Sequence, residues 1–210
     1  MAIHVNVGPL QVSRGEEGWD LKRVVGVLIR VCEALAYAHD KDVVHRDVKP
    51  GNVMVGKFGE VFLMDWGLAK VMGREEDVGG ADSSMIHTLR SDGSSAEHTL
   101  AGDVVGTPAF MAPEQALGRG DEVGPGSDIY AVGAMLYFAL SGQLPYQPLG
   151  ESASALTILE AVKSGPPWSV KKINPEAPPE LIAICEKAMA RERSERFGDA
   201  MALGEELRNW

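Results

Sequence analysis

The chain has 210 residues, of which 45% are hydrophobic and 24% are charged, a composition typical of a soluble globular domain and not of a disordered segment. Its formal net charge of −10 argues against nonspecific binding to nucleic acid or to an anionic membrane, because both need a basic surface. Residues 129–140 form the longest nearly apolar run, shorter than the roughly 18–20 residues that span a bilayer. No basic stretch followed by an apolar one begins the chain, so we expect no membrane segment or signal peptide and a cytoplasmic location.

The first third of the chain predicts one helix and one β-hairpin. Residues 1–19 have weak periodicity and are expected to form a loose lead-in. From Asp20 onward, apolar residues recur at helical spacing through residue 38, which predicts a helix with one buried face and Asp20 as its N-cap. Two short β-rich runs, 53–55 and 61–64, are joined by a glycine-containing connection and predict a hairpin.

The remainder predicts a long loop followed by helices. Residues 73–106 are rich in Gly, Ser, Asp and Glu, and a loop of this length is usually functional or disordered. Residues 128–140 are apolar almost all round, which predicts a central buried helix. Further helices are expected over 153–163, 179–190 and 197–207.

The cysteines and histidines give no metal-binding pattern. Cys32 and Cys185 both fall within predicted helices and are expected to be buried free thiols in a reducing compartment. His39, His87 and His98 have no potential ligands at short spacing, so we predict no zinc site.

The stretch most informative about function is residues 45–52, His-Arg-Asp-Val-Lys-Pro-Gly-Asn. It sets an acid, a cation and an amide on one irregular loop between the long helix and the hairpin. Each residue alone would be read as a solvated surface group. The whole string resembles the catalytic loop of protein kinases, in which an Asn follows the Asp by five positions.

Four further motifs support this resemblance, and they occur in the expected order. Asp-Trp-Gly at residues 65–67 follows the second hairpin strand, residues 106–114 resemble the end of an activation segment, and residues 127–133 resemble the start of the buried helix of the large lobe. Arg196 matches the arginine that pairs with Glu114 of the Ala-Pro-Glu motif. Residues 20–210 therefore resemble the C-terminal lobe of a bacterial Hanks-type serine/threonine protein kinase. The fold implied is mainly α, with a small β-hairpin carrying the catalytic and metal-binding loops and residues 73–106 in the activation segment.

The resemblance implies ATP and Mg²⁺ as cofactors and assigns a role to five residues. Asp47 would accept the proton of the substrate hydroxyl, and Lys49 would lie near the γ-phosphate. Asn52 and Asp65 are hard oxygen ligands suited to Mg²⁺. Met54 would form the apolar floor under the adenine, or it would be a plain core side chain.

The substrate side and the structural contacts are implied in the same way. Lys49, together with Thr107, points to protein serine and threonine substrates. Arg46 would bind a phosphate on the activation segment, where serines and threonines between residues 83 and 99 either accept phosphate or merely keep the loop soluble.

Three more residues are implied to be structural. Asp128 should bind the backbone near His45, itself expected to be a packed core residue. Glu114 and Arg196 should form a buried ion pair.

Two kinase elements have no counterpart before residue 20, namely the glycine-rich loop and the strand lysine. We therefore expect the small N-terminal lobe to be absent from this chain, and the isolated chain to be weak or inactive as an enzyme. A missing small lobe, or a partner, would cover the exposed cleft. The alternative is a non-catalytic, pseudokinase-like binding module or a truncated remnant.

Overall fold

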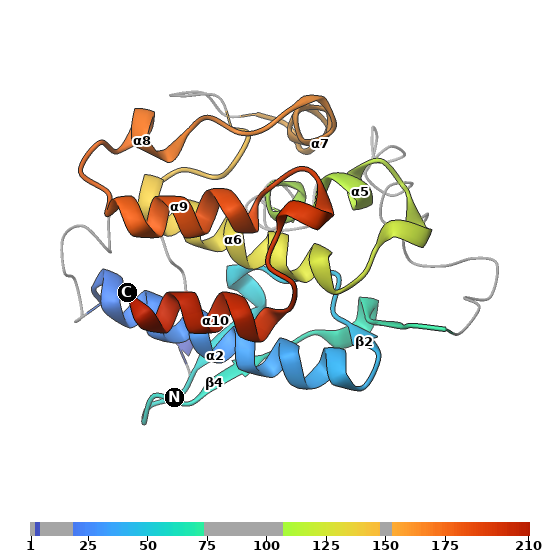
Figure 1. Ribbon diagram of the computed structural model, residues 1–210, viewed down its shortest axis with the longest axis horizontal. Coiled ribbons are helices and arrows are strands. Elements are labelled where there is room, and N and C mark those ends of the chain that lie inside the picture. Colours follow the sequence, from blue (N-terminus) through green and yellow to red (C-terminus); the bar gives the residue numbers. More distant parts are fainter. Residues whose placement is uncertain (1–2, 5–18, 74–106, 148–152) are drawn as a thin grey trace, which may run out of the picture.

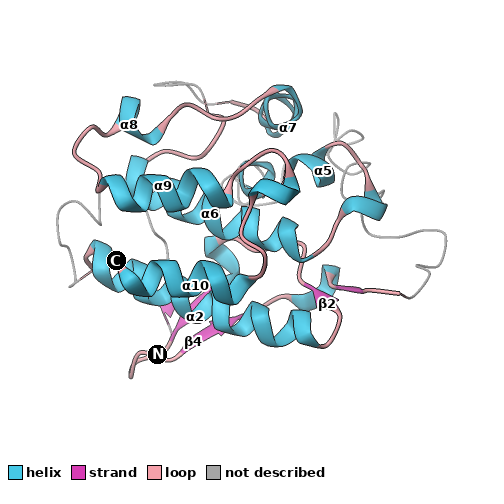
Figure 2. Ribbon diagram, viewed as in Figure 1, coloured by secondary structure: helices cyan, strands magenta, loops and turns pink. Residues whose placement is uncertain are grey.

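The computed structural model describes residues 3–4, 19–73, 107–147 and 153–210, and helices make up most of it (Figure 2). The helices are α2 (Leu21–Asp40), α5 (Pro113–Ala116), α6 (Pro125–Ser141), α7 (Ala155–Ser164), α8 (Val170–Ile173), α9 (Pro179–Ala188) and α10 (Ala200–Asn209). The strands are β1 (Ile3–His4), β2 (Val43–Val44), β3 (Val53–Val55), β4 (Val61–Leu63) and β5 (Lys70–Val71). The prediction of a mainly helical fold with a small hairpin is confirmed.

Helix α6 forms the centre of the core. Ile129, Tyr130 and Leu136 are among its fully buried side chains, and the helix packs against α9 on one side and α2 on the other (Figure 1). It begins three residues before the predicted start because Pro125, with its fixed φ, occupies the first turn. Gly142 ends it in the left-handed conformation, with φ of 78°.

Helices α2 and α10 lie side by side and form the layer nearest the strands (Figure 1). As predicted, α2 buries one face and Asp20 caps it, since the Asp20 carboxylate accepts a hydrogen bond of 2.7 Å from the Arg23 N–H. Helix α10 begins at Ala200 and not at residue 197, because Asp199 is the residue whose side chain caps it.

Two small antiparallel sheets complete the fold. In the predicted hairpin, Met54 of β3 lies opposite Phe62 of β4. Strand β1 adds to the free edge of β3, with Ile3 opposite Val55, although the sequence predicts no strand there. A two-residue strand carries no periodic pattern of its own and is defined by its pairing alone. Strands β2 and β5 form the second sheet.

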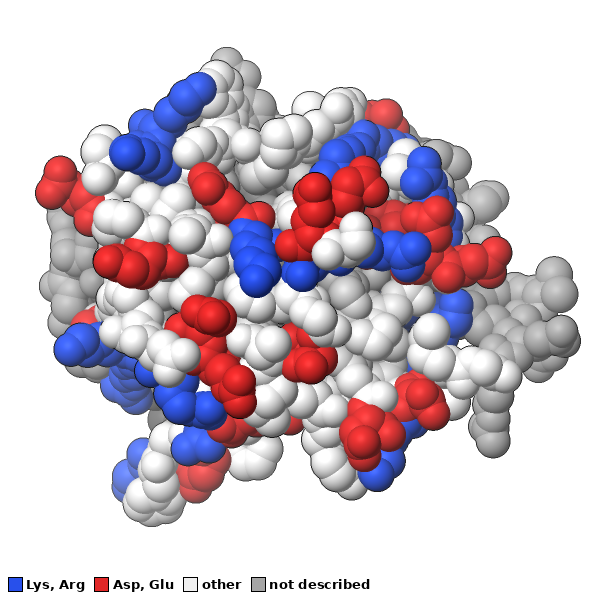
Figure 3. Space-filling view, viewed as in Figure 1, with Lys and Arg blue, Asp and Glu red and all other residues white. Residues whose placement is uncertain are grey.

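Acidic and basic side chains are intermixed over the face of the molecule shown in Figure 3. Some of these charges join elements that are distant in sequence. Glu33 of α2 binds Arg208 of α10 at 2.8 Å and also Arg30 on its own helix at 2.8 Å. Both pairs lie at the surface, so each contributes at most about 1 kcal/mol to stability, and only the pair with Arg208 joins the two helices.

The two cysteines are free and buried, as predicted. None of the described helices is both long enough and apolar enough to cross a membrane. The predicted lead-in and the predicted loop at 73–106 fall mainly outside the described residues, which in those stretches are 3–4, 19 and 73.

Candidate functional site

The loop that follows β2 is held in place by a carboxylate from the central helix. Asp128 lies in the first turn of α6 and is only 1% exposed. Its Oδ2 accepts a hydrogen bond of 2.9 Å from the His45 N–H, and its Oδ1 accepts one of 2.8 Å from the Arg46 N–H. The Asp128 carboxylate and the backbone near His45, which the resemblance to kinases pairs, therefore lie together in the structure. The two hydrogen bonds fix the start of the loop through its backbone.

Three of the predicted site residues form one cluster on this loop. Asp47 Oδ2 lies 2.8 Å from the Lys49 ammonium nitrogen. The Asn52 amide donates to the same Asp47 Oδ2 at 3.0 Å and to the Asp47 backbone carbonyl at 2.7 Å. The Asp47 side chain is 9% exposed and that of Lys49 is 24% exposed. The cluster therefore holds an oriented carboxylate beside a cation that solvent can still reach.

His45 links this loop to the segment that carries Asp65. The Asp47 N–H donates to His45 Nδ1 at 3.3 Å, so Nδ1 is an acceptor and the ring proton is on Nε2. Nε2 then donates to the Met64 carbonyl at 2.9 Å. The ring is fully buried and lies against the Trp66 indole, with ring centroids 4.5 Å apart. His45 is thus the packed residue that the sequence predicts.

Asp65 lies next to the residue that pairs with Asn52. The Met64 N–H donates to the Asn52 carbonyl at 2.8 Å, which extends the hairpin ladder to the start of the Asp-Trp-Gly motif. Asp65 has φ of 61° and ψ of 67°, and its carboxylate accepts from the Gly67 N–H at 3.4 Å. A left-handed conformation costs a non-glycine residue about 1–3 kcal/mol, and residues held in it cluster at functional sites.

Met54 lies on the outer face of the hairpin. Its neighbours in β3, Val53 and Val55, are buried, whereas Met54 is partly exposed opposite Phe62, which is 52% exposed. Met64, at the end of the same face, is 39% exposed. The geometry therefore favours a surface position for Met54 over a plain core position.

Arg46 connects the loop to the segment around the Ala-Pro-Glu motif. Its backbone has φ of 69°, and its guanidinium Nε–H donates to the Leu68 carbonyl. The Gln115 side-chain amide of α5 donates to the Arg46 carbonyl at 2.8 Å and accepts from the Ala112 N–H at 3.2 Å. Gln115 was not predicted as a site residue, since nothing in a single sequence distinguishes this amide. The side chain of Thr107 lies outside the described residues.

Glu114 and Arg196 form a buried, two-pronged ion pair. The two terminal guanidinium nitrogens of Arg196 donate to the Glu114 carboxylate oxygens at 2.7 and 2.9 Å. The Arg196 side chain is 0% exposed and that of Glu114 is 3% exposed. The Ser127 hydroxyl donates to Glu114 Oε1 at 2.7 Å. Burial opposes ionisation of Glu114, but the hydrogen bonds and charge of Arg196 outweigh it and lower the pKa of the carboxyl. The pair ties α5 to the turn before α10.

The donor set at the loop suits a magnesium ion shared with a phosphate ligand. Among the described residues, no three side chains of His, Cys, Asp or Glu gather into a metal centre. Asn52 and Asp65 offer one amide oxygen and one carboxylate. Mg²⁺ usually takes one or two carboxylates and completes its shell with waters and substrate phosphates, so these two residues fit it.

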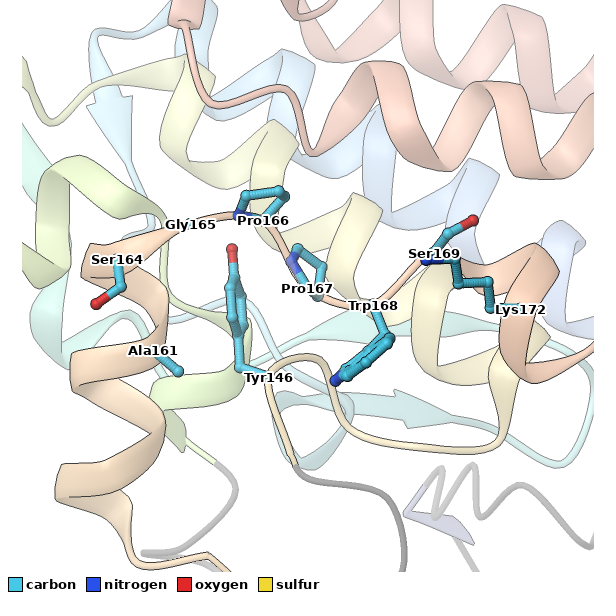
Figure 4. Close-up of a pocket in the computed structure, with 9 residues that line it drawn as sticks. All are labelled: Tyr146, Ala161, Ser164, Gly165, Pro166, Pro167, Trp168, Ser169 and Lys172. Atoms are coloured by element: carbon cyan, nitrogen blue, oxygen red, sulfur yellow. The ribbon is translucent and has the colours of Figure 1, made fainter.

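A separate hollow of about 430 Å³ lies between α7 and α8 (Figure 4). Tyr146 and Trp168 line it together with Pro166, Pro167 and Lys172. None of the predicted site residues is among those that line it. The candidate site is therefore the loop cluster and not this hollow.

Comparison with known proteins gives the cluster a family context. A family model described as the protein kinase domain matches residues 12–207. The chain belongs to the protein kinase family. The kinase relatives include the serine/threonine-protein kinase PknD of Chlamydia pneumoniae, 32% identical over 87% of this chain and 18% of the relative. PknD of Protochlamydia amoebophila is 39% identical over 66% of this chain and 14% of the relative.

A third relative is a probable serine/threonine-protein kinase PknB of Bifidobacterium longum, 35% identical over 83% of this kinase chain and 22% of the relative. The chain thus spans about a fifth or less of the length of the PknD relatives it matches. The match to the family model begins at residue 12, before the predicted start of the lobe at residue 20. It therefore supports a protein kinase domain but not the prediction that the chain holds the C-terminal lobe alone.

Proposed function

We propose that this chain carries the catalytic loop of a serine/threonine protein kinase, which transfers the γ-phosphate of ATP to a serine or threonine hydroxyl of a protein. The observation that carries the proposal is the fixed cluster of Asp47, Lys49 and Asn52. An acid oriented by an amide and placed beside a cation suits phosphoryl transfer, in which positioning and charge neutralisation supply most of the catalysis.

Asp47 is proposed to position and deprotonate the substrate hydroxyl. As the hydroxyl oxygen bonds to the γ-phosphorus, the bond from that phosphorus to the β,γ-bridging oxygen breaks and the hydroxyl proton passes to the Asp47 carboxylate. The Asn52 amide holds one Asp47 oxygen, so the carboxylate keeps one orientation. Lys49, 2.8 Å from that carboxylate, is placed to offset negative charge on the transferred phosphoryl group.

Asn52 and Asp65 are proposed to hold Mg²⁺, and Met54 to contact the adenine. A bound Mg²⁺ would neutralise charge on the ATP phosphates. The hydrogen bond from the Met64 N–H to the Asn52 carbonyl supports this assignment. It places Asp65, the residue after Met64, next to Asn52. The partly exposed outer face that carries Met54 offers an apolar surface to a base.

Arg46 and Thr107 are proposed to act on the substrate side of the site. Arg46 would bind a phosphate on the activation segment, and Thr107 with Lys49 would favour serine and threonine over tyrosine. Two free buried thiols suit a reducing compartment, which supports a cytoplasmic location.

A small lobe or a partner is proposed to cover the outer face of the hairpin. Phe62 and Met64 are 52% and 39% exposed, and Trp66 of the Asp-Trp-Gly motif is 37% exposed. The 210 residues contain neither the glycine-rich loop motif nor the strand lysine motif of the family. The described residues would then be the large lobe, and this chain alone would transfer phosphate weakly or not at all.

The decisive experiment follows radiolabelled phosphate from Mg·ATP to a generic basic protein. It uses the natural-length polypeptide that contains these residues and, in parallel, the 210-residue chain. We expect transfer by the natural-length protein and a loss of about 10²–10⁴-fold in its Asp47→Asn variant. Asp40→Asn, an exposed acid of α2, is the matched control and should leave the rate unchanged. Full activity in Asp47→Asn would refute the role given to Asp47.

A binding module without catalysis is the second candidate, and the exposed apolar face of the hairpin favours it. Under this hypothesis the natural-length protein would show no transfer and no magnesium-dependent ATP binding by calorimetry. Loss of ATP affinity on Asp65→Asn, measured with Mg²⁺ present, would instead support the kinase.

A further inference from the structure

The hollow between α7 and α8 is lined by aromatic rings and takes no part in the proposed chemistry. Figure 4 shows the rings of Tyr146 and Trp168 below Pro166 and Pro167, which lie on the segment that leads from α7 to α8. Trp168 is 53% exposed, so much of its indole faces the solvent. Tryptophan is enriched at the buried centres of protein interfaces, where its ring packs against a partner. The hollow therefore offers an apolar platform to a second molecule.

The floor and one wall of this hollow are fixed by contacts within the domain. Tyr146 is 8% exposed, and its hydroxyl is hydrogen-bonded to the Tyr130 hydroxyl of α6. At the end of α7, the Arg191 guanidinium donates to the Val162 carbonyl at 3.1 Å and to the Lys163 carbonyl. A site that is already formed loses little conformational entropy when a partner binds. The hollow is thus shaped before any partner arrives.

The polar groups around the hollow favour an acidic partner. Lys172 is the one charged side chain among the described residues that line it. Its ammonium nitrogen lies 5.6 Å from the centroid of the Trp168 ring and pairs with no carboxylate in the described part of the chain. The Trp168 indole N–H has no hydrogen-bond acceptor among the described residues either. Both groups are donors only, so a carboxylate is the group that complements them.

We propose that this hollow is a docking site for a peptide segment of a partner protein, in which an aromatic side chain is flanked by acidic residues. The aromatic ring would pack against Trp168 and Tyr146, and a neighbouring carboxylate would pair with Lys172. A peptide fits better than a small metabolite, because small-molecule sites bury most of their ligand and the Trp168 side of this hollow is open to solvent. The proposal concerns binding alone and does not rest on the proposed kinase activity.

The first test is a titration of the whole 210-residue chain with synthetic peptides, followed by nuclear magnetic resonance at the Trp168 indole N–H. The Trp168→Phe variant assigns that resonance. The probe is the blocked peptide Gly-Ser-Asp-Phe-Asp-Ser-Gly, and its matched controls replace both Asp by Lys, or Phe by Ala. The probe should shift the resonance, and each control should bind about tenfold more weakly or less. An unmoved resonance, or equal binding of the three peptides, would overturn the proposal.

The second test changes the charge of the hollow. Lys172→Gln should weaken binding of the acidic probe about threefold to fivefold, the amount that a solvent-exposed ion pair supplies. Lys171→Gln removes the same charge from the next residue, which is not among those that line the hollow, and should leave binding unchanged. Lys172→Glu should reverse the preference in favour of the lysine peptide, a gain that a misfolded variant could not show. Equal effects of the two Gln variants, or no reversal, would overturn the proposal.

Two controls separate the peptide from other occupants. N-acetylphenylalanine has a ring and a carboxylate without the rest of the peptide, and it should bind about tenfold more weakly than the probe. Equal affinity would assign the hollow to a small aromatic acid instead. Sedimentation velocity should show that the chain does not dimerise through this face. A dimer that Trp168→Ala dissociates would make a second copy the occupant, and it would overturn the proposal.

Discussion

Replacing Arg196 by methionine should destabilise the domain far more than any change at an exposed residue. The substitution removes a guanidinium that is 0% exposed and leaves Glu114, 3% exposed, with the Ser127 hydroxyl as its remaining side-chain partner among the described residues. It also removes the donor from the carbonyls of Gly126, Ala190 and Arg191. Breaking one side of a buried ion pair typically costs about 3–5 kcal/mol. For a chain of this size, that lowers the midpoint of thermal unfolding by roughly 6–20 °C.

The assay is urea unfolding followed by tryptophan fluorescence and circular dichroism, with the double variant Glu114→Met, Arg196→Met as the control. The double variant removes the lone buried charge but still leaves the three carbonyls without their donor. It should therefore recover only part of the lost stability. A loss of less than about 1 kcal/mol of unfolding free energy in the single Arg196→Met variant would refute this reasoning, because the pair would then contribute no more than a solvent-exposed ion pair.

The pH dependence gives an independent check on the same pair. The pKa of Glu114 in the folded protein lies below its ordinary value of 4.5. The stabilisation is therefore fully present above about pH 4.5 and is lost as the pH falls through the folded pKa. The difference in unfolding free energy between the natural protein and Arg196→Met should shrink below pH 4.5. A difference that grows on acidification would refute the assignment.

Two further predictions concern packing and thiol chemistry. Gly133→Ala should destabilise by about 1–2 kcal/mol in urea unfolding, since the new Cβ would lie 2.7 Å from Ala188 Cβ. Gly26→Ala, whose Cβ meets nothing within 4 Å, should instead stabilise by up to about 1 kcal/mol, and equal effects of the two changes would contradict the packing argument. Burial raises the pKa of the Cys32 thiol to about 12 and that of Cys185 above its usual range. Neither thiol should react with an aromatic disulfide reagent at pH 8 until urea is added, and rapid labelling of the native protein would show that a thiol is accessible.

The sequence predicts the helices best where the apolar pattern is strong. Helix α6 is apolar almost all round, α2 has one clear apolar face with an Asp cap, and both are found within three residues of their predicted bounds. The hairpin is also found, because glycine and alternating β-formers mark it locally. The order of the kinase motifs predicts the family, and the cluster of Asp47, Lys49 and Asn52 follows because these residues share one short loop.

Long-range contacts could be predicted only where the resemblance to kinases implies them, as for Glu114 with Arg196, and the others could not. His39 and Asp128 are 89 positions apart in the sequence, and nothing local to either residue indicates that they meet. The Gln115 amide reaches the Arg46 carbonyl across 69 positions in the same way. Strand β1 exists through its pairing with β3. The two side-chain contacts are products of the packing of α2, α5 and α6, and no local sequence pattern indicates that packing.

Asp128 binds the loop through the main-chain N–H groups of His45 and Arg46. This anchor therefore does not depend on which side chains those two residues carry. An amide hydrogen is offered by every residue type except proline, so the anchor tolerates a change of side chain at either position. Side chains of the loop that make no hydrogen bond to its backbone can therefore be altered without loss of this anchor. Two further constraints are that residue 46 must accept a φ of 69° and that the His45 ring and the Asn52 amide themselves bind loop backbone atoms.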